Sequence, residues 1–378
     1  MYGRFLSTAS DLIFCRGDPV SESTGGEIGL RRLLLFEFLH ADSDAFVTAA
    51  DRMRSEGRAM LQAVLTDAVA LPDLSVTVLL CEAAQAALNS LPAGCELLGC
   101  RDLSPLDALA SAAGDFDFVL PVVPECDGLL LRVAQTLQPL KCTTLLPSLS
   151  VVETCSDKLR TWDAFCSSLI PMIECMSACC DSSKSGFSDP GAIFKPRRGA
   201  GCEGIQRGQL PTTANPQDYI RQPFIKGSSL SIGVLSSPGG IQLLPVARQD
   251  IIWQGVWPKY NGGTIPADIS CEMEARVTSI AEYVMQQIGR FTGYLGMDFL
   301  VVEADGMVFL NEINPRVCTS YVGYRQLLEF NPLGVLLGYP AGPVRRAASR
   351  SISFRSDGEP KHCETGEPSS NMTRRPVT

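Results

Sequence analysis

The chain has 378 residues, of which 45% are apolar, and its formal net charge is −9 at pH 7. This length predicts two or three domains or subdomains, and the apolar content is sufficient for a sizeable buried core. An acidic chain argues against nucleic-acid binding as the main function, because such partners require basic surfaces.

The first part of the chain predicts an open α/β domain. We expect residues 1–30, rich in glycine, serine and charge, to be a loose leader. Continuous apolar runs at 33–39, 75–80 and 116–123 are typical of strands buried on both faces, and residues 45–70 have helical spacing. Strands alternating with helices predict a parallel sheet, which we assign to residues 31–120.

The rest of the chain predicts antiparallel sheets with some helix. We divide it into a central region, 121–225, and a second region, 226–340. Short strand patterns lie at 191–196, 219–225, 229–235 and 241–247, and residues 272–290 carry a helical apolar stripe. Residues 341–378 contain few apolar side chains, so we expect a disordered tail.

The cysteines limit the cellular setting. The chain has 15 of them, and the densest group, Cys175, Cys179 and Cys180, lacks the CxxC spacing and nearby histidines of a zinc site. We interpret them as buried or free thiols, which suit a reducing cytoplasm. No run of about 18 apolar residues predicts a membrane span. We therefore expect a cytoplasmic protein without a membrane partner.

The stretch LNEINPRVCTSY places Glu312, Asn314 and Arg316 two residues apart. On a strand, this spacing directs all three side chains to one face. Asp305-Gly306 lies between two strand patterns and predicts a β-hairpin. A salt bridge between Glu312 and Arg316 at a sheet edge would explain the stripe equally well.

The length of the hairpin loop decides which side chains face each other, because a slip of one residue turns each of them to the other face. A two-residue loop would put Glu312 on the face opposite to Asp298. We favour a three-residue loop of residues 304–306 with Gly306 at positive φ. It would pair Asp298 with Glu312, Leu300 with Leu310, and Val302 with Val308.

The three-residue loop is favoured for a chemical reason. It gathers Asp298, Glu312 and Asn314 on one face, and their oxygens are hard ligands suited to magnesium. Without a cation, two facing carboxylates would repel each other and one would tend to hold a proton. Magnesium bound by so few carboxylates also needs phosphate ligands.

Two lysines are candidates for phosphate binding. Lys158 lies in the first turn of a helix predicted for residues 155–165, with Ser156 as its N-cap. A lysine there is unfavourable for the helix dipole, and a nearby anion would offset that cost. A solvated lysine is the simpler alternative. Lys195 ends a strand immediately before a glycine-rich loop.

That loop contains Gly199, Gly201 and Gly204 in the segment FKPRRGAGCEGI. Glycines allow backbone N–H groups to approach phosphate oxygens closely. The loop has neither the spacing of a Walker motif nor the helix that follows a dinucleotide fingerprint. From this segment alone, a plain mobile loop is an equally good interpretation.

The segment RQPFIK predicts an edge or linker strand, because Pro223 cannot donate a hydrogen bond to a sheet. Backbone groups of Phe224 and Ile225 in such a linker could pair with an adenine edge. A crossover between domains without a ligand role is the alternative.

The order of these features resembles the ATP-grasp superfamily over roughly residues 120–335: a lysine, a second lysine with a glycine loop, an apolar linker, then Asp and Glu-x-Asn-x-Arg. EINPR with TSYVGY, and SEGRAML and VPECDGLLLR nearer the N-terminus, are similar to the tyramine–glutamate ligases of methanofuran biosynthesis. The resemblance implies an N-terminal open parallel α/β (pre-ATP-grasp) domain followed by a two-subdomain ATP-grasp fold. The first subdomain would lie within 121–225, and the second, with the metal site, within 226–340.

The resemblance also implies roles for the site residues. Glu312 would bridge two magnesium ions also bound by Asp298 and Asn314, with manganese as the alternative ion. Arg316 would act in catalysis together with two lysines by stabilising the transferring phosphoryl group. The residues that would bind ATP are Lys158, Lys195, Gly199, Gly201, Gly204, Gln222, Phe224, Ile225 and Ser229. Ser229 stands where many ATP-grasp chains have a ribose-binding glutamate.

The implied reaction activates a carboxylate, by resemblance that of glutamate, as an acyl phosphate and joins it to a tyramine-like amine, releasing ADP and phosphate. Arg248, Thr319, Ser320 and Tyr321 are candidates to contact these substrates. One alternative is a ligase that makes another amide or a dipeptide. Another is a nucleotide-binding regulator without turnover, which Ser229 and the unusual glycine loop would explain. We expect small-molecule partners and no nucleic acid, and leave a homo-oligomer open.

Overall fold

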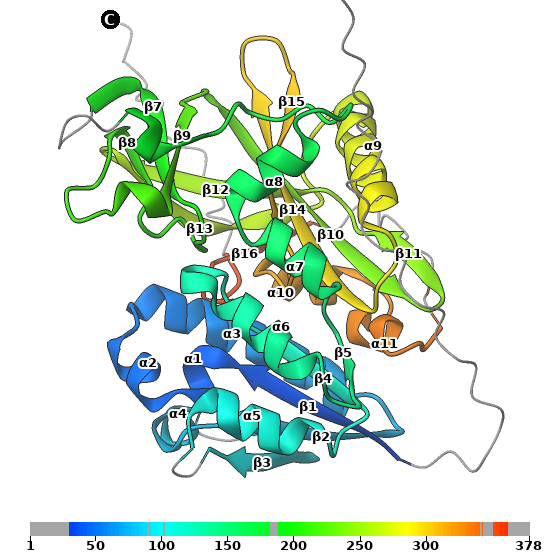
Figure 1. Ribbon diagram of the computed structural model, residues 1–378. Coiled ribbons are helices and arrows are strands. Elements are labelled where there is room, and N and C mark those ends of the chain that lie inside the picture. Colours follow the sequence, from blue (N-terminus) through cyan, green and yellow to red (C-terminus); the bar gives the residue numbers. More distant parts are fainter. Residues whose placement is uncertain are drawn as a thin grey trace, which may run out of the picture.

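The structure is a computed structural model that describes residues 30–88, 91–100, 103–181, 188–340, 342 and 351–361. A parallel α/β part forms the lower half of the molecule in Figure 1, and two antiparallel sheets form the upper half. This mixture of a parallel N-terminal sheet and antiparallel sheets confirms the predicted fold class.

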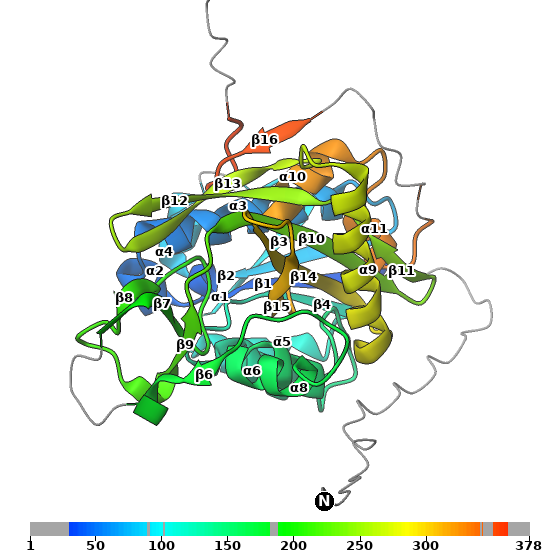
Figure 2. The ribbon, with the colours of Figure 1, turned by 90° about the horizontal axis from the view of Figure 1, so that it is seen from above.

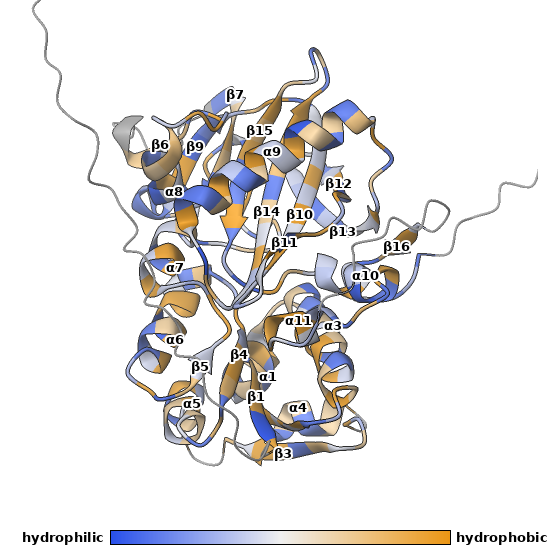
Figure 3. Ribbon diagram, turned by 90° about the vertical axis from the view of Figure 1, so that its right-hand side faces the viewer, coloured by the Kyte–Doolittle hydropathy of each residue, from blue (hydrophilic) through white to orange (hydrophobic). Residues whose placement is uncertain are grey.

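The N-terminal sheet has the order β3-β2-β1-β4-β5, and neighbouring strands are parallel. Its strands are β1 Arg31–Glu37, β2 Leu74–Leu80, β3 Cys95–Gly99, β4 Phe118–Val122 and β5 Thr143–Thr144. The helices of this region are α1 Phe38–Ala41, α2 Ser43–Thr48, α3 Asp51–Val69, α4 Glu82–Ala87, α5 Pro105–Ala113 and α6 Leu129–Leu137. Apolar residues dominate β1 and β4 (Figure 3). Helices therefore cover both faces of these strands, as their continuous apolar runs predict.

A small antiparallel sheet with the order β6-β9-β7-β8 follows two helices. The helices are α7 Leu149–Cys155 and α8 Lys158–Phe165, and the strands are β6 Met176–Ser177, β7 Ser188–Pro196, β8 Gln206–Gln209 and β9 Tyr219–Pro223. This sheet lies to one side of the larger antiparallel sheet when the molecule is seen from above (Figure 2). Pro223 predicted an edge or linker strand. Because β9 pairs with both β6 and β7, the edge alternative is wrong; the proline is its last residue, and residues 224–226 link it to β10.

The large antiparallel sheet has the order β15-β14-β10-β12-β13-β16, with β11 also paired to β10. Its strands are β10 Gly227–Ser237, β11 Gly240–Leu243, β12 Ala247–Gln254, β13 Trp257–Ile265, β14 Gly293–Val302, β15 Val308–Asn314 and β16 Ile352–Phe354. The remaining helices are α9 Cys271–Ile288, α10 Ser320–Leu327 and α11 Pro332–Leu336. The core beneath α9 contains Val277, Ala281 and Val284, so its apolar stripe is a core face.

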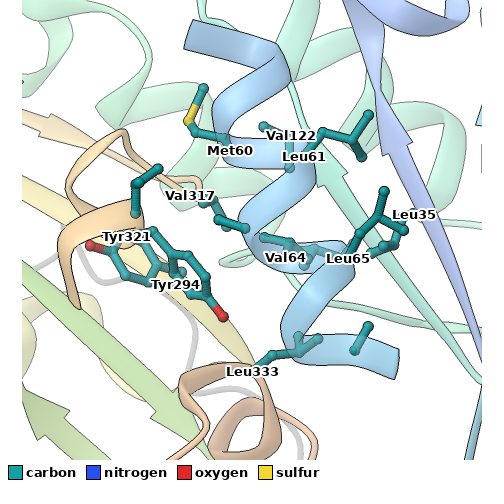
Figure 4. Packing of buried hydrophobic residues seen from close by; sticks show 14 of the residues in the cluster. Leu35, Met60, Leu61, Val64, Leu65, Val122, Tyr294, Val317, Tyr321 and Leu333 are labelled. Carbon is teal, nitrogen blue, oxygen red and sulfur yellow. The ribbon is translucent and has the colours of Figure 1, made fainter. Parts of the chain in front are cut away.

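Helix α3 joins the two halves of the molecule. In Figure 4 it lies between Leu35 and Val122 of the parallel sheet and Tyr294 and Tyr321 of the C-terminal part. These residues belong to one hydrophobic cluster that runs through both halves. The two halves are therefore packed as one body around the cleft that they share.

Several element boundaries differ from the prediction for local reasons. Strand β1 ends at Glu37, because the Glu37 side chain caps α1 by accepting from the backbone N–H of His40. The helix expected at 45–70 is broken, since Ala49 and Ala50 are extended between α2 and α3. The strand expected at 241–247 stops at Leu243, two residues before a proline.

The expected disordered tail is wrong for residues 352–354, which form β16 against β13. Phe354 is 1% exposed and belongs to the core that surrounds α3, which explains why this short segment is ordered. Most of the predicted tail, His362 included, and nearly all of the predicted leader lie outside the described residues. No helix in the described parts of the chain has the length and apolarity of a membrane span.

Candidate active site

A cavity of about 870 Å³ lies between the three sheets. Its walls come from the glycine loop, the linker after β9, strands β10, β12, β14 and β15, and the N-terminal half. The N-terminal wall includes the carboxyl ends of β1 and β4, which are neighbours in the sheet. The strand order reverses there, because β2 lies on one side of β1 and β4 on the other. Ligands of open parallel sheets bind at such a switch point, outside the carboxyl ends of the strands.

The hairpin places Asp298 opposite Glu312, as predicted, but for a different reason. The loop is longer than three residues: Val301 pairs with Val308, and the N–H of Val302 donates to the carbonyl of Met307. The predicted pairs of Val302 with Val308 and Leu300 with Leu310 are therefore wrong. Gly306 has φ +69°, as expected.

A β-bulge restores the register at the site. Phe299 pairs with Leu310 and Asp298 with Glu312, so Asn311 is an extra residue on β15. The signal was present in the sequence: Leu310 and Ile313, each 1% exposed, are three residues apart and cannot both face the core of a regular strand. The bulge lets Asn311, Glu312 and Asn314 all line the cavity.

The two facing carboxyl groups have opposite protonation tendencies. Burial and the neighbouring Glu312 carboxylate raise the pKa of Asp298 well above its ordinary value. The pKa of Glu312 is lowered: burial alone would raise it, but Lys158 and Lys195 outweigh that effect. Asp298 thus holds the proton that two facing carboxylates were expected to retain. Gln249 Nε2 and Asn314 Nδ2 also donate to Asp298, at 2.8 and 3.0 Å.

Lys158 begins α8, and its N-cap is Asp157 rather than the predicted Ser156. The Asp157 carboxylate accepts from the N–H groups of Leu159 and Arg160 and also pairs with Arg197 at 2.8 Å. Asp157 is better placed than Ser156 because its backbone is extended, whereas Ser156 still has helical geometry at the end of α7.

The Lys158 ammonium lies between strand β15 and the glycine loop. Its Nζ is 3.1 Å from Glu312 Oε2 and donates at 3.1 Å to the carbonyl of Gly199. Burial disfavours its charge, but the Glu312 carboxylate prevails and raises the pKa of Lys158. The predicted solvated lysine is therefore wrong, because the ammonium is buried at the cavity wall.

Lys195 lies on β7 and also approaches strand β15. Its Nζ donates to Asn311 Oδ1 at 2.9 Å. Burial lowers the pKa of Lys195, Glu312 opposes this, and the positive charge of Lys158 adds to the lowering. Two buried ammonium groups beside one carboxylate leave positive charge in the cavity that an anionic ligand would balance.

The glycine loop closes one side of the cavity, which Gly199 and Gly201 line. Gly201 and Gly204 have φ of +63° and +69°, and Cys202 between them has φ +66°. A Cβ at Gly204 would lie 2.9 Å from both Pro196 Cγ and Tyr219 Oη, so only glycine fits there. Strand β8 follows the loop, as the absence of a helical pattern predicted.

The linker residues line the cavity at the end farther from the N-terminal half. Gln222 is 6% exposed, and its Oε1 has no hydrogen-bond partner among the described residues. Phe224 stacks beneath Arg207, with 3.9 Å from the guanidinium carbon to the ring centre, and its N–H donates to the carbonyl of Gly191. Ile225 and Ser229 also line the cavity.

Arg316 is held by a residue that the prediction missed. Its Nε and Nη2 donate to the two carboxylate oxygens of Glu125, each at 2.9 Å, and Nη1 donates to the carbonyl of Val317. Arg316 still lines the cavity. The alternative salt bridge between Glu312 and Arg316 is therefore wrong, because the partner of Arg316 is Glu125.

Three of the four residues expected to contact substrates line the cavity: Arg248, Thr319 and Ser320. Tyr321 does not, because its hydroxyl donates to Asp67 Oδ2 at 2.7 Å within the core. It therefore ties α10 to α3.

The polar side chains of the cavity fit the nucleotide and the metal ion that the resemblance implies. The unpartnered Gln222 Oε1 fits an amino donor such as that of adenine. Asp298 retains a proton beside the ionised Glu312, and a divalent cation would take the place of that proton between the two carboxyl groups. In the described ranges no group of three His, Cys, Asp or Glu residues could hold a metal ion.

Comparisons with known proteins agree with this geometry. Residues 155–320 match the family model described as an ATP-grasp domain. No protein among the curated proteins matches the chain. A solved ATP-grasp superfamily protein from Archaeoglobus fulgidus is 21% identical, with a TM-score of 0.65, over 86% of this chain and 92% of that one.

Two further solved structures are similar at 14% identity and a TM-score of 0.61. One is the ADP complex of purK, an N5-carboxyaminoimidazole ribonucleotide synthetase, over 86% of this chain and 81% of that one. The other is biotin carboxylase from Campylobacter jejuni, over 84% of this chain and 73% of that one. At such identities these structures establish the shared fold.

Proposed function

We propose that this protein is an ATP-dependent ligase that activates a carboxylate and joins it to an amine, because residues 155–320 match the family model of an ATP-grasp domain. The observation that carries the proposal is one cavity in which two buried lysines and an arginine surround the facing pair Asp298 and Glu312. Such a site supplies charge neutralisation and alignment, which are what phosphoryl transfer requires.

In the first step, an oxygen of the substrate carboxylate attacks the γ-phosphorus of ATP, and the bond to the β–γ bridging oxygen breaks to release ADP. Lys158 and Lys195 hold the phosphates, Arg316 faces the transferring group, and the glycine loop excludes water. Asp298, Glu312 and Asn314 would hold magnesium, which when bound neutralises the phosphate charge.

In the second step, the amine nitrogen attacks the acyl carbon, and the carbon–oxygen bond to phosphate breaks. Phosphate leaves with the oxygen that belonged to the carboxylate. An ammonium substrate gives up two protons in total, one of which is found on the phosphate and one in the solvent. The products are an amide, ADP and phosphate.

The finer assignment is glutamate as the carboxylate and a tyramine-like amine, with magnesium as the ion. The segments EINPR, TSYVGY, SEGRAML and VPECDGLLLR support it. EINPR and SEGRAML contain the cavity residues Glu312 and Glu56. VPECDGLLLR contains Glu125, which holds Arg316, and TSYVGY contains Tyr321, which donates to Asp67 on α3.

The test is ADP release by the purified protein with Mg-ATP and a panel of amino acids combined with amines. Glu312→Ala should reduce turnover by at least ~100-fold, because one carboxylate of the metal site is lost. Glu282→Gln, on the solvent side of α9, is the matched control and should retain full activity. Full activity of Glu312→Ala would refute the metal assignment.

Two alternatives are separated by the same panel. ADP release with a different acid and amine would indicate a ligase for another amide or a dipeptide. ATP binding without ADP release for any pair would favour a nucleotide-binding regulator, which Ser229 in place of a ribose-binding glutamate also motivates. The retention of both lysines, Arg316 and the acidic pair in one cavity favours the ligase.

A further inference from the structure

The cavity continues beyond the proposed phosphate site to a wall formed by the N-terminal half. There it is lined by Leu39, Met53, Met60, Val122 and Val123, which are apolar. Two carboxyl groups, those of Glu37 and Glu56, lie in this otherwise apolar wall. The proposed phosphoryl transfer uses neither of them.

Glu56 lies on α3 and is 8% exposed. Its nearest cationic partner is Arg52, with 3.4 Å between Arg52 Nε and Glu56 Oε1, but neither of these atoms has a hydrogen-bond partner in the described structure. A buried polar atom without a partner is unusual in a folded protein and indicates a missing ligand or water. An ionised carboxylate only accepts hydrogen bonds, so Glu56 Oε1 needs a donor, whereas the unpartnered Nε and Nη2 of Arg52 need acceptors.

Glu37, at the end of β1, packs against the same turn of α3. A Cβ at Gly57 would lie 2.7 Å from Glu37 Oε1, so the absence of a side chain at position 57 is what allows the Glu37 carboxyl group to lie against this turn. His40 is bound through Oε2 of Glu37. The carboxyl groups of both Glu37 and Glu56 line the cavity.

The position of Glu56 relative to the reacting groups agrees with a second substrate site. Burial raises the pKa of Glu56 to about 7, and the guanidinium groups of Arg52 and Arg316 oppose this rise. Arg316 is thus near enough to Glu56 to act on its charge. A Cβ at Gly201 would lie 3.4 Å from Glu56 Oε2, so a substrate held at Glu56 would lie beside the glycine loop.

We propose that Glu56, with Glu37 in the same cavity wall, binds the ammonium group of the acceptor substrate, a primary amine with an apolar carbon skeleton that packs on Met53 and Met60. The inference rests on the proposed ligase function and names where and how its second substrate is recognised. A partly apolar wall that carries two carboxyl groups suits an ammonium group with three donors on an apolar skeleton.

The first test is direct binding, which does not depend on turnover. Calorimetry with tyramine, in the presence of a non-hydrolysable ATP analogue, should give binding to the wild type and at least ~10-fold weaker binding to Glu56→Gln. The alcohol that carries a hydroxyl in place of the amino group should bind both proteins equally weakly. Equal amine binding by the wild type and Glu56→Gln, or no binding by the wild type, would overturn the proposal.

The second test separates this proposal from a structural role for Glu56. In steady-state assays, Glu56→Gln and Glu37→Gln should raise KM for the amine ~10- to ~100-fold and leave KM for ATP within about twofold. Gly57→Ala keeps both carboxyl groups but displaces Glu37, and should raise the same KM. Glu282→Gln is the matched control.

A rise in KM for ATP instead would mean that the pair only supports the glycine loop, since a Cβ at Gly201 would lie 3.4 Å from Glu56 Oε2. A rise confined to KM for the amino acid would mean that Glu56 binds the donor's ammonium group. Either result overturns the proposal. Failure of the ligase proposal is distinguishable, because it would appear as an absence of ADP release with intact amine binding.

Discussion

Arg316 and Glu125 lie 191 residues apart in the chain and are joined by two hydrogen bonds of 2.9 Å in the interior. Desolvating two such charges is costly, and a well-aligned bidentate pair offsets much of that cost. The pair therefore fixes the plane of the guanidinium before any ligand binds. A rigid cation at the cavity wall is what stabilisation of a transferring phosphoryl group requires.

Glu56 gives a prediction at the same scale. The folded state raises its pKa from 4.5 to about 7, so between these values the folded protein binds more protons than the unfolded chain. The stabilisation that results is present at low pH and is lost as the pH rises toward 7. Glu56→Gln removes this dependence, so its stability relative to the wild type should improve by about 2 kcal/mol between pH 5.5 and pH 8.

Urea unfolding of both proteins at several pH values measures this difference. Glu282 is exposed, so the free energy of unfolding of Glu282→Gln should change with pH in the same way as that of the wild type. If the free energy of unfolding of Glu56→Gln also followed that of the wild type at every pH, burial would not raise the pKa of Glu56.

At the scale of elements, the β14–β15 hairpin shows how a strand accommodates both a core and a site. Val308, Leu310 and Ile313 face the core, and the extra residue Asn311 makes this possible. The same residue gives Lys195 its hydrogen-bond acceptor. The bulge thus turns one additional polar side chain toward the cavity.

Deletions in β15 test this reading. Deleting Asn311 leaves Leu310 and Ile313 on the core side and Asp298 opposite Glu312, so the melting temperature should change by only a few degrees. Deleting Phe309 instead moves Leu310 out of phase with the core, and should cost about 2–5 kcal/mol. Thermal unfolding followed by circular dichroism compares the two variants. Equal destabilisation would contradict the assignment of Asn311 as the bulged residue.

At the scale of the whole molecule, α3 couples the N-terminal half to the C-terminal half. Asp67 on this helix accepts from the Tyr321 hydroxyl at 2.7 Å and from Arg325 Nε at 3.0 Å, and its carbonyl accepts from Asn331 Nδ2 at 2.7 Å. The same helix carries Glu56 into the cavity. The shape of the cavity therefore depends on this junction.

Asp67→Ala should lower the free energy of unfolding by about 3 kcal/mol, because it leaves a buried hydroxyl and a guanidinium without their partner. Below its unfolding transition, the variant should keep KM for ATP, since Asp67 is outside the cavity. Chemical unfolding and ADP release measure the two effects, with the exposed Asp115→Ala as the control. A loss of ATP affinity without a loss of stability would contradict a purely structural junction.

The sequence alone determined the features that depend on local periodicity. The apolar runs of β1 and β2, the stripe of α9, Gly306 at positive φ and the polar stripe on β15 each follow from spacing within one element. The facing of Asp298 and Glu312 was also predicted, although the loop length assumed for it was wrong. The family resemblance supplied the roles of the candidate site residues, and the structure places them around one cavity, except that Gly204 and Tyr321 do not line it.

Tertiary structure decided the contacts between segments that are distant in the chain. Glu125 on Arg316, Gln249 on Asp298, Asp67 on Tyr321 and Glu56 in the cavity wall have no signal in spacing, because each depends on how two elements pack. The ordering of β16 has the same origin, since a three-residue strand is stable only against β13 and the core. Periodicity specifies which face of an element is buried; only packing specifies what that face meets.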